Sequence, residues 1–299
     1  MAQGSGKQAL VVTEPSPAPT NPTGGTTGGK TKKSNRKVKI IQTPETDMLT
    51  DLWAEVFIVG EEPHGFPAMF ARARCTKAKE LHKADIVLFT GGVPDVSPEL
   101  YGETRHKTTL NEEWADLRDI QVFQEAAYLG IPMVGVCRGA QFLHVMNHGK
   151  LFQDVDNHNS WHEIYDKRTN EYIGPVSSVH HQMCRPNPEN GMEVIAVAYE
   201  SSTKHLNATM SYTQLEKTDE EDIEAFWYPE TACLGVQGHP EYRGYDEYTA
   251  WFIDLIDQYI IENPDISLTQ GNRRLKPEVI DRRKWRMPQS AFDFMKKYG

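Results

Sequence analysis

Cys137 lies between an apolar segment and a predicted helix, a place where a cysteine can act as a nucleophile. The apolar residues 132–136 predict a buried strand, and a helix is predicted over residues 139–147. Gly135 and Gly139 flank the cysteine and leave room for a tight turn. The amide groups at a helix N-terminus favour the thiolate form of a nearby cysteine. The pattern therefore predicts a thiolate nucleophile, with an inert core cysteine as the alternative.

A histidine with a neighbouring carboxylate follows another predicted strand, over residues 233–237. Pro240 keeps the segment His239-Pro240-Glu241 extended, and side chains two residues apart in an extended segment point to the same side. Glu241 can then fix the tautomer of His239, which is what a cysteine nucleophile requires of its base. We therefore expect His239 and Glu241 to act together with Cys137.

Two adjacent glycines follow a third predicted strand, over residues 85–89. Acyl transfer develops negative charge on the carbonyl oxygen of the substrate, and backbone N–H groups must face that oxygen. A backbone without side chains at Gly91 and Gly92 can approach a substrate closely. We expect the N–H groups of Gly92 and Arg138 to form this oxyanion hole. The alternative is that the two glycines form a simple turn.

These segments belong to an alternation of strands and helices along the chain. Such an alternation predicts an α/β fold with a mainly parallel sheet flanked by helices on both faces. Further strands are predicted over residues 38–41 and 55–60, and further helices over residues 66–83, 114–129 and 248–260. Residues 205–225 are polar and acidic and predict an exposed insertion.

The composition divides the chain into three parts. Residues 1–37 are rich in Pro, Gly and Thr, end in a basic cluster and predict a disordered tail. Residues 38–263 form the predicted catalytic domain. Residues 264–299 form a basic extension with a few aromatic residues, and this extension can pack back on the domain.

The charge and the cysteines restrict the partners and the compartment. The chain of 299 residues carries a net charge of −10, and its acidic middle part is a poor candidate for binding nucleic acid. Contact of the basic tails with nucleic acid or an acidic partner remains open. The four cysteines form no CxxC pair, which favours a reducing compartment and predicts a cytoplasmic location. We expect neither a membrane span nor export, because no apolar run of about 18 residues and no secretory segment is visible.

The pattern Gly135-x-Cys137-x-Gly139-x-Gln141, followed by His-Pro-Glu, resembles the class I glutamine amidotransferase superfamily. The similarity is greatest to its branch of γ-glutamyl hydrolases, which includes enzymes that cleave γ-glutamyl-γ-aminobutyrate. The resemblance covers roughly residues 38–260 and leaves out both tails. Three further segments are similar to that branch, at residues 90–103, 149–155 and 178–182.

The resemblance implies a flavodoxin-like fold and a set of site residues. The matching positions of the family's catalytic triad are Cys137, His239 and Glu241. The family also implies substrate-binding roles for Gly91, Gln141, His180 and His181, the last three around the α-amino and α-carboxylate groups of a glutamyl substrate. The family often has Trp before the catalytic histidine, whereas this chain has Gly238, which predicts a more open pocket.

The predicted function is hydrolysis of the γ-amide C–N bond of glutamine or of a γ-glutamyl amine through a γ-glutamyl thioester on Cys137. One alternative is a glutaminase subunit that donates ammonia to a separate synthase partner, since the chain has no P-loop and no nucleotide-binding glycine pattern. The other alternative is a binding protein that kept the fold and lost the chemistry.

Several histidines permit a different chemistry, that of a zinc site. The candidate ligands are His158, His162, His180, His181 and Cys184. Their spacing fits no compact zinc motif. We therefore expect no metal ion and no other cofactor.

Overall fold

The structure of this protein is a computed structural model. It describes residues 54–61, 65–199, 204–206, 216–217, 221–242, 244 and 246–299. The predicted tail over residues 1–37 and the predicted strand over residues 38–41 lie outside the described residues.

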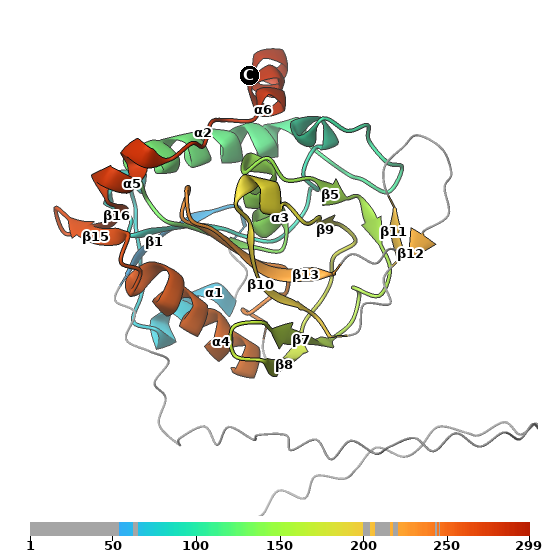
Figure 1. Cartoon of the computed structure of the whole chain (residues 1–299), viewed down its shortest axis with the longest axis horizontal. Coiled ribbons are helices and arrows are strands. Elements are labelled where there is room, and N and C mark those ends of the chain that lie inside the picture. The colour runs from blue at the N-terminus through green and yellow to red at the C-terminus, as the bar shows by residue number, and fades with distance from the viewer. Residues whose placement is uncertain are drawn as a thin grey trace, which may run out of the picture. The chain divides into compact units, whose positions relative to one another are not determined.

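A nine-stranded sheet forms the centre of the described part of the chain (Figure 1). Four neighbouring pairs on one side are parallel, and the four pairs on the other side are antiparallel. The sheet is therefore mixed, and the predicted parallel arrangement holds for the half that carries the sequence motifs. The strands, in spatial order, are β2 (Thr76–Lys77), β1 (Glu55–Val59), β3 (Ile86–Phe89), β4 (Met133–Val136), β14 (Cys233–Val236), β13 (Ile223–Tyr228), β10 (Glu193–Ala198), β7 (His162–Asp166) and β8 (Glu171–Val176).

Helices cover both faces of the sheet, as the α/β prediction requires. Helices α1 (Gly65–Arg72) and α4 (Asp246–Ile256) pack on one face, and α2 (Glu113–Leu129) and α3 (Arg138–Met146) pack on the other (Figure 1). The strands are buried on both sides, with alternate residues in two separate hydrophobic cores. In β3, for example, Leu88 belongs to the core under α4 and Phe89 to the core under α3.

Two predicted segments differ from the structure. The helix predicted over residues 66–83 ends at Arg72, because Arg74 takes a positive φ of 55° and the next residues form strand β2 and a short 3-10 turn, Leu81–Lys83. The exposed insertion predicted over residues 205–225 is wrong at its C-terminal end. Strand β13 begins at Ile223 and is buried throughout, and the acidic Asp222 and Glu224 are buried with it.

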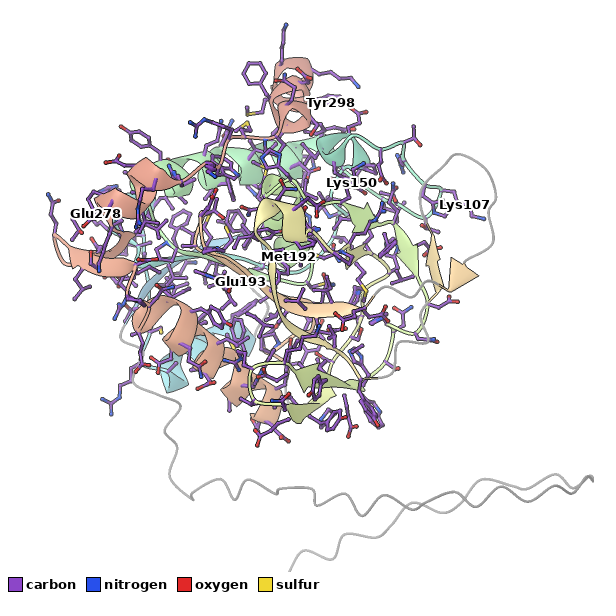
Figure 2. All side chains as sticks on the ribbon, viewed as in Figure 1. Lys107, Lys150, Met192, Glu193, Glu278 and Tyr298 are labelled. Atoms are coloured by element: carbon purple, nitrogen blue, oxygen red, sulfur yellow. The ribbon has the colours of Figure 1, made fainter. Side chains whose placement is uncertain are left out.

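The C-terminal extension contributes to both cores: its hairpin and its first helix pack with the core on the α1 and α4 side, and the residues from Trp285 onward pack on the face that α2 and α3 cover. It consists of a hairpin, β15 (Ile266–Thr269) and β16 (Asn272–Leu275), and of helices α5 (Pro277–Arg282) and α6 (Gln289–Tyr298). Trp285 packs against Phe123 of α2, with 5.5 Å between ring centroids, and its indole N–H donates to the Met146 carbonyl at 2.9 Å. Tyr298, which Figure 2 labels at the end of α6, donates a hydrogen bond to Glu99.

Two arginines of the extension form hydrogen bonds with backbone carbonyls of the domain. The Arg274 guanidinium donates to the carbonyls of Ala84 and His82, each at 2.7 Å, and Arg283 donates to the Ala127 carbonyl in the last turn of α2. A cation near a helix C-terminus stabilises the exposed carbonyl groups there. These two arginines therefore have structural partners within the chain.

The described residues also form smaller sheets outside the central sheet. One pairs β5 (Leu151–Phe152) with β9 (Met183–Cys184), and another joins β6 (Asp154–Val155), β11 (Lys204–Leu206) and β12 (Glu216–Lys217). None of the helices in the described part of the chain combines the length and the apolar character that crossing a bilayer requires.

Candidate active site

The predicted nucleophile Cys137 occupies a tight turn between β4 and α3. Its backbone has φ 50° and ψ −111°, a conformation that a non-glycine residue rarely adopts. The turn is held by a hydrogen bond from the Cys137 N–H to the Val236 carbonyl of the neighbouring strand, at 2.8 Å. The flanking glycines are required, since a Cβ at Gly135 would lie 2.5 Å from the Ala140 nitrogen and one at Gly139 would overlap the Phe89 carbonyl.

His239 and Glu241 follow the adjacent strand β14 and face each other. The Nδ1 atom of His239 lies 2.8 Å from Oε1 of Glu241. A carboxylate only accepts hydrogen bonds, so Nδ1 carries a proton and Nε2 is the atom available for catalysis. Both side chains are almost completely buried, which protects this pair from competition by water. The extended segment around Pro240 thus gives the convergence that the sequence predicts.

Ser177 fixes the backbone of the same histidine, although nothing in the sequence marks it. Its hydroxyl donates to the His239 carbonyl at 3.0 Å and accepts from the His239 N–H at 3.1 Å. The imidazole also stacks on Tyr242, with 4.6 Å between ring centroids. Ser177 and Tyr242 thus hold the backbone and the ring of His239 in place. Sequence spacing alone does not reveal these contacts.

Gly91 brings the glycine loop into contact with both predicted catalytic side chains. A Cβ at this position would lie 2.7 Å from Cε1 of His239 and 3.2 Å from Cβ of Cys137. Gly92, the next residue, has a φ of +130°, which favours glycine. Arg138 is the first residue of α3, so its N–H has no acceptor within the helix. Gly91 and Cys137 are thus in contact, and the two predicted oxyanion donors, the N–H groups of Gly92 and Arg138, belong to the residues that follow them in the chain.

The neighbouring Cys137 and Glu241 influence the charge state of His239. Burial acts to lower the pKa of His239, but the hydrogen bonds and charges of Cys137 and Glu241 outweigh it and raise the pKa to about 10. The imidazole therefore holds its second proton at neutral pH.

The Arg138 side chain points away from the reacting groups and holds the turn in place. Its guanidinium forms buried ion pairs with Asp116, at 2.7 Å, and with Asp119, both on α2. Asp116 also accepts a hydrogen bond from the Ser97 N–H at 3.0 Å, and Arg138 donates to the Pro94 carbonyl. Burial raises the pKa of Asp116 to about 6, although Arg138 acts in the opposite direction. This network connects α2, α3 and the loop that follows Gly92.

The four predicted substrate-binding residues take different positions. Gly91 lies against Cys137, as described above. Gln141 donates to the Gln182 carbonyl at 2.8 Å, which ties α3 to the 178–182 segment. His181 is half-buried and hydrogen-bonds Asp95 at 3.1 Å, and this contact raises the pKa of His181. His180 is buried against the ring of His158, with 4.7 Å between centroids, and burial lowers its pKa to about 3.

A cavity of about 450 Å³ borders the glycine loop and the start of α3. Gly91 and Arg138 line its inner part, and the exposed side chains of Val93, Leu110 and Trp114 line its outer part. Gly238 does not widen a pocket, contrary to the expectation from its size. A Cβ there would lie 2.5 Å from Val176 and 2.8 Å from the Tyr248 hydroxyl, so neighbouring side chains already fill this space.

Comparison with known proteins identifies the family of this chain. The family model for Peptidase C26 matches residues 53–241. The chain belongs to the Peptidase C26 family. Within the family's range lie the glycine loop, the Cys137 turn and the His239–Glu241 pair. Membership places the chain in the class I glutamine amidotransferase superfamily and supports an amide hydrolase or amidotransferase type of activity.

Individual relatives are distant. The glutamine amidotransferase-like protein YvdE of Lactococcus lactis is 29% identical over 185 residues, which cover 60% of this chain and 72% of YvdE. A glutamine amidotransferase structure from Thermotoga maritima is 13% identical with a TM-score of 0.43, covering 68% of this chain and 83% of that one. One from Methylobacillus flagellatus is 13% identical with a TM-score of 0.44, covering 82% and 86%.

Proposed function

We propose that this Peptidase C26 protein hydrolyses the γ-amide bond of glutamine or of a γ-glutamyl amine, with Cys137 as the nucleophile. The observation that carries the proposal is the meeting of three segments at one point. The Cys137 turn, the Gly91 loop and the His239–Glu241 pair come from separate strands and lie in contact. Such a set supplies a nucleophile, a proton carrier with its orienting carboxylate, and backbone donors for an oxyanion.

The first half of the reaction forms a thioester. The Cys137 sulfur attacks the γ-carbonyl carbon, a C–S bond forms, and the carbonyl electron pair moves to oxygen. The N–H groups of Gly92 and Arg138 stabilise that oxyanion. When it collapses, the C–N bond breaks and His239 transfers its Nε2 proton to the leaving nitrogen. Ammonia or an amine departs and the γ-glutamyl group remains on sulfur.

The second half returns the cysteine. A water molecule gives a proton to His239 and its oxygen attacks the thioester carbon. The C–S bond then breaks, glutamate leaves and the proton stays with the Cys137–His239 pair. The raised pKa of His239 depends on the charge of Cys137. The acylated sulfur carries no charge, so the pKa of His239 falls in the intermediate and the imidazole can act as a base.

The surroundings of the site support a γ-glutamyl substrate. We assign recognition of the α-amino and α-carboxylate groups to His181, which pairs with Asp95, and to Gln141, which binds the 178–182 segment. The cavity of about 450 Å³ is lined by Gly91 and Arg138, the neighbours of the reacting side chains, and we place the leaving amine of the substrate there. We also propose a cytoplasmic location, which the four free and buried thiols support.

Product analysis tests this proposal. The purified protein is incubated with glutamine and with a panel of γ-glutamyl amines, and the products are identified by mass spectrometry. We expect release of glutamate and the free amine by the wild-type chain and none by Cys137→Ala. Equal turnover by the variant would reject Cys137 as nucleophile. If glutamine turnover is slow alone and rises with a synthase, the chain is instead an ammonia-donating subunit.

A further inference from the structure

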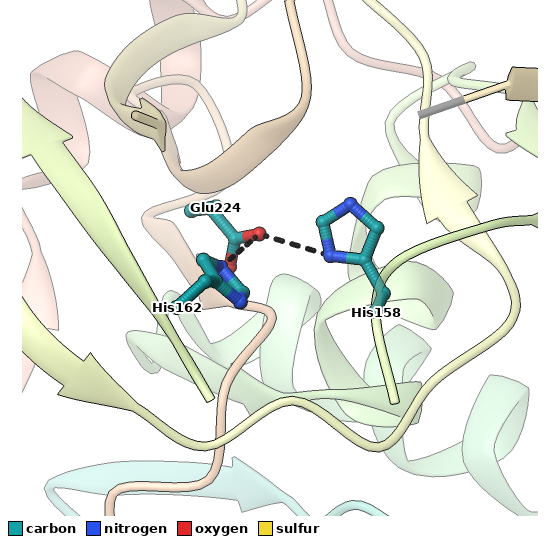
Figure 3. Close-up of side chains that lie close together, drawn as sticks. All are labelled: His158, His162 and Glu224. Carbon is teal, nitrogen blue, oxygen red and sulfur yellow. Dashed lines mark hydrogen bonds and ion pairs between the residues drawn. The ribbon is translucent and has the colours of Figure 1, made fainter. Parts of the chain in front are cut away.

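A second group of chemically active side chains lies apart from the Cys137, His239 and Glu241 set. His158, His162 and Glu224 converge in the described part of the chain (Figure 3). The Glu224 Oε1 atom lies 3.0 Å from Nε2 of His162 and 3.5 Å from Nδ1 of His158. One ligand atom from each residue lies within 4.8 Å of the other two. His158 and Glu224 are buried and His162 is partly buried.

The spacing of these atoms fits the coordination shell of a small divalent ion. A zinc ion with tetrahedral ligands at about 2.0–2.2 Å holds the ligand atoms about 3.3 Å apart. The two separations that involve Glu224, 3.0 and 3.5 Å, lie on either side of that value, and all three ligand atoms lie within 4.8 Å of one another. Two imidazoles and one carboxylate are a ligand set used by zinc and by related transition metals. Small side-chain movements would therefore suffice to bind an ion.

The second nitrogen of His158 has the partner that a metal-bound histidine normally has. Its Nε2 atom lies 3.3 Å from Oδ2 of Asp222, which is itself buried. A carboxylate on the far nitrogen fixes the tautomer in which the lone pair of Nδ1 faces Glu224 and makes Nδ1 a stronger donor to a metal. The Ser178 hydroxyl donates to the His158 carbonyl at 2.8 Å and holds the same residue from its backbone.

Glu224 supplies a second, independent reason. Its side chain is completely buried, and its Oε2 atom has no hydrogen-bond partner among the described residues. A buried carboxylate with an unsatisfied oxygen is costly unless a positive charge compensates it. His180 lies against His158, and its Nε2 atom likewise has no described partner. A divalent ion would provide the missing charge in this region.

We propose that His158, His162 and Glu224 bind a divalent transition-metal ion of the Zn²⁺ type, with Asp222 orienting His158. The site uses no residue of the Cys137, His239 and Glu241 set. The ion would join the 158–162 segment to strand β13. It would thereby support the neighbouring 178–182 segment, because the His180 N–H donates to the His158 carbonyl at 3.0 Å.

The expectation that no metal ion binds was drawn from the spacing of four histidines and one cysteine. Glu224 was not among the residues considered. Of the five residues weighed there, only His158 and His162 belong to the converging group. Glu224 belongs to residues 205–225, whose acidic composition predicted an exposed insertion. Strand β13 carries it into the interior instead.

Metal binding is tested with the full chain in a Cys137→Ala background, which removes the predicted catalytic thiol as a competing zinc ligand. The protein is stripped with a chelator, dialysed and titrated with Zn²⁺ by calorimetry. We expect one ion per chain. Glu224→Gln, His162→Gln and His158→Asn should each weaken binding at least tenfold. His82→Gln is the matched control, because His82 forms an exposed pair with Glu80 at 3.2 Å and should not affect affinity.

A cobalt spectrum covers the case in which a buried variant fails to fold. Co²⁺ added to the Cys137→Ala protein should give visible absorption typical of nitrogen and oxygen ligands, without a thiolate charge-transfer band. Circular dichroism identifies variants that are unfolded and therefore uninformative about the ligands. The proposal is overturned if the Cys137→Ala protein binds no Zn²⁺, if all folded ligand variants bind as tightly as their parent, or if a thiolate band appears.

Discussion

Replacing Gly91 with alanine tests the contact between the glycine loop and the reacting side chains. The new Cβ would lie 2.7 Å from Cε1 of His239, whereas ordinary contact begins near 3.4 Å. The ring or the loop must therefore move by about 0.7 Å, a displacement close to the ~1 Å that can cost a reaction about 100-fold. We expect kcat for glutamate release to fall by roughly 100-fold, which corresponds to about 2.7 kcal/mol of transition-state stabilisation.

A second glycine of the same region serves as the control. Gly102 has a positive φ, of +71°, which disfavours alanine, but a Cβ there would meet nothing within 4 Å. Gly102→Ala should therefore cost some stability and leave kcat within about threefold of the wild type. Thermal unfolding of both variants, followed by circular dichroism, separates loss of fold from loss of geometry. A Gly91→Ala protein that folds normally and keeps wild-type kcat would refute the reasoning.

Three further substitutions probe the network around the site. Glu241→Gln should lower the pKa of His239 in an NMR titration and reduce kcat by about 10²–10⁴-fold, because Glu241 raises that pKa and orients the ring; an unchanged pKa would contradict this. Arg138→Met should reduce the urea-measured unfolding free energy by about 3–5 kcal/mol, since it leaves the buried Asp116 without its cationic partner and leaves Asp119 with Arg118 alone, whereas a loss below about 1 kcal/mol would argue against the network. His144→Asn should flatten the acid dependence of stability. Burial lowers the pKa of His144 from 6.5 to about 4, so the unfolded chain binds more protons and the wild type loses up to about 3 kcal/mol as pH falls through that range. Equal slopes for the two proteins would exclude His144 as the cause.

The sequence predicted the elements whose signal is local. The apolar runs and the glycines around Cys137 specify a strand, a turn and a helix within about 15 residues, and the structure places them at Met133–Val136 and Arg138–Met146. The His239–Glu241 contact depends on two residues in one extended segment, and it was predictable for the same reason. Their convergence with Gly91 follows from parallel strands that end at the same edge of a sheet.

The missed features depend on partners that are distant in the sequence. Asp116 and Asp119 lie on the buried side of α2, and their contacts with Arg138, Ser97 and Arg118 explain why carboxylates occur there. Ser177 reaches His239 across 62 positions of the chain. Glu224 looked like part of an acidic insertion, because composition cannot distinguish an exposed carboxylate from a buried one that lies between two histidines. The helix predicted over residues 66–83 ends early because strand β2 pairs with β1, and this backbone pairing overrides the helical periodicity of the sequence.

The central claim is that Cys137 carries a γ-glutamyl group during turnover, and rapid acid quenching followed by mass spectrometry tests it directly. The wild-type protein is mixed with a γ-glutamyl substrate, quenched within the first turnover and digested. We predict that the peptide containing Cys137 gains the mass of one γ-glutamyl group, and that the gain is removed by hydroxylamine and absent from Cys137→Ala. Turnover without this adduct, or an adduct on another residue, would contradict the proposed mechanism.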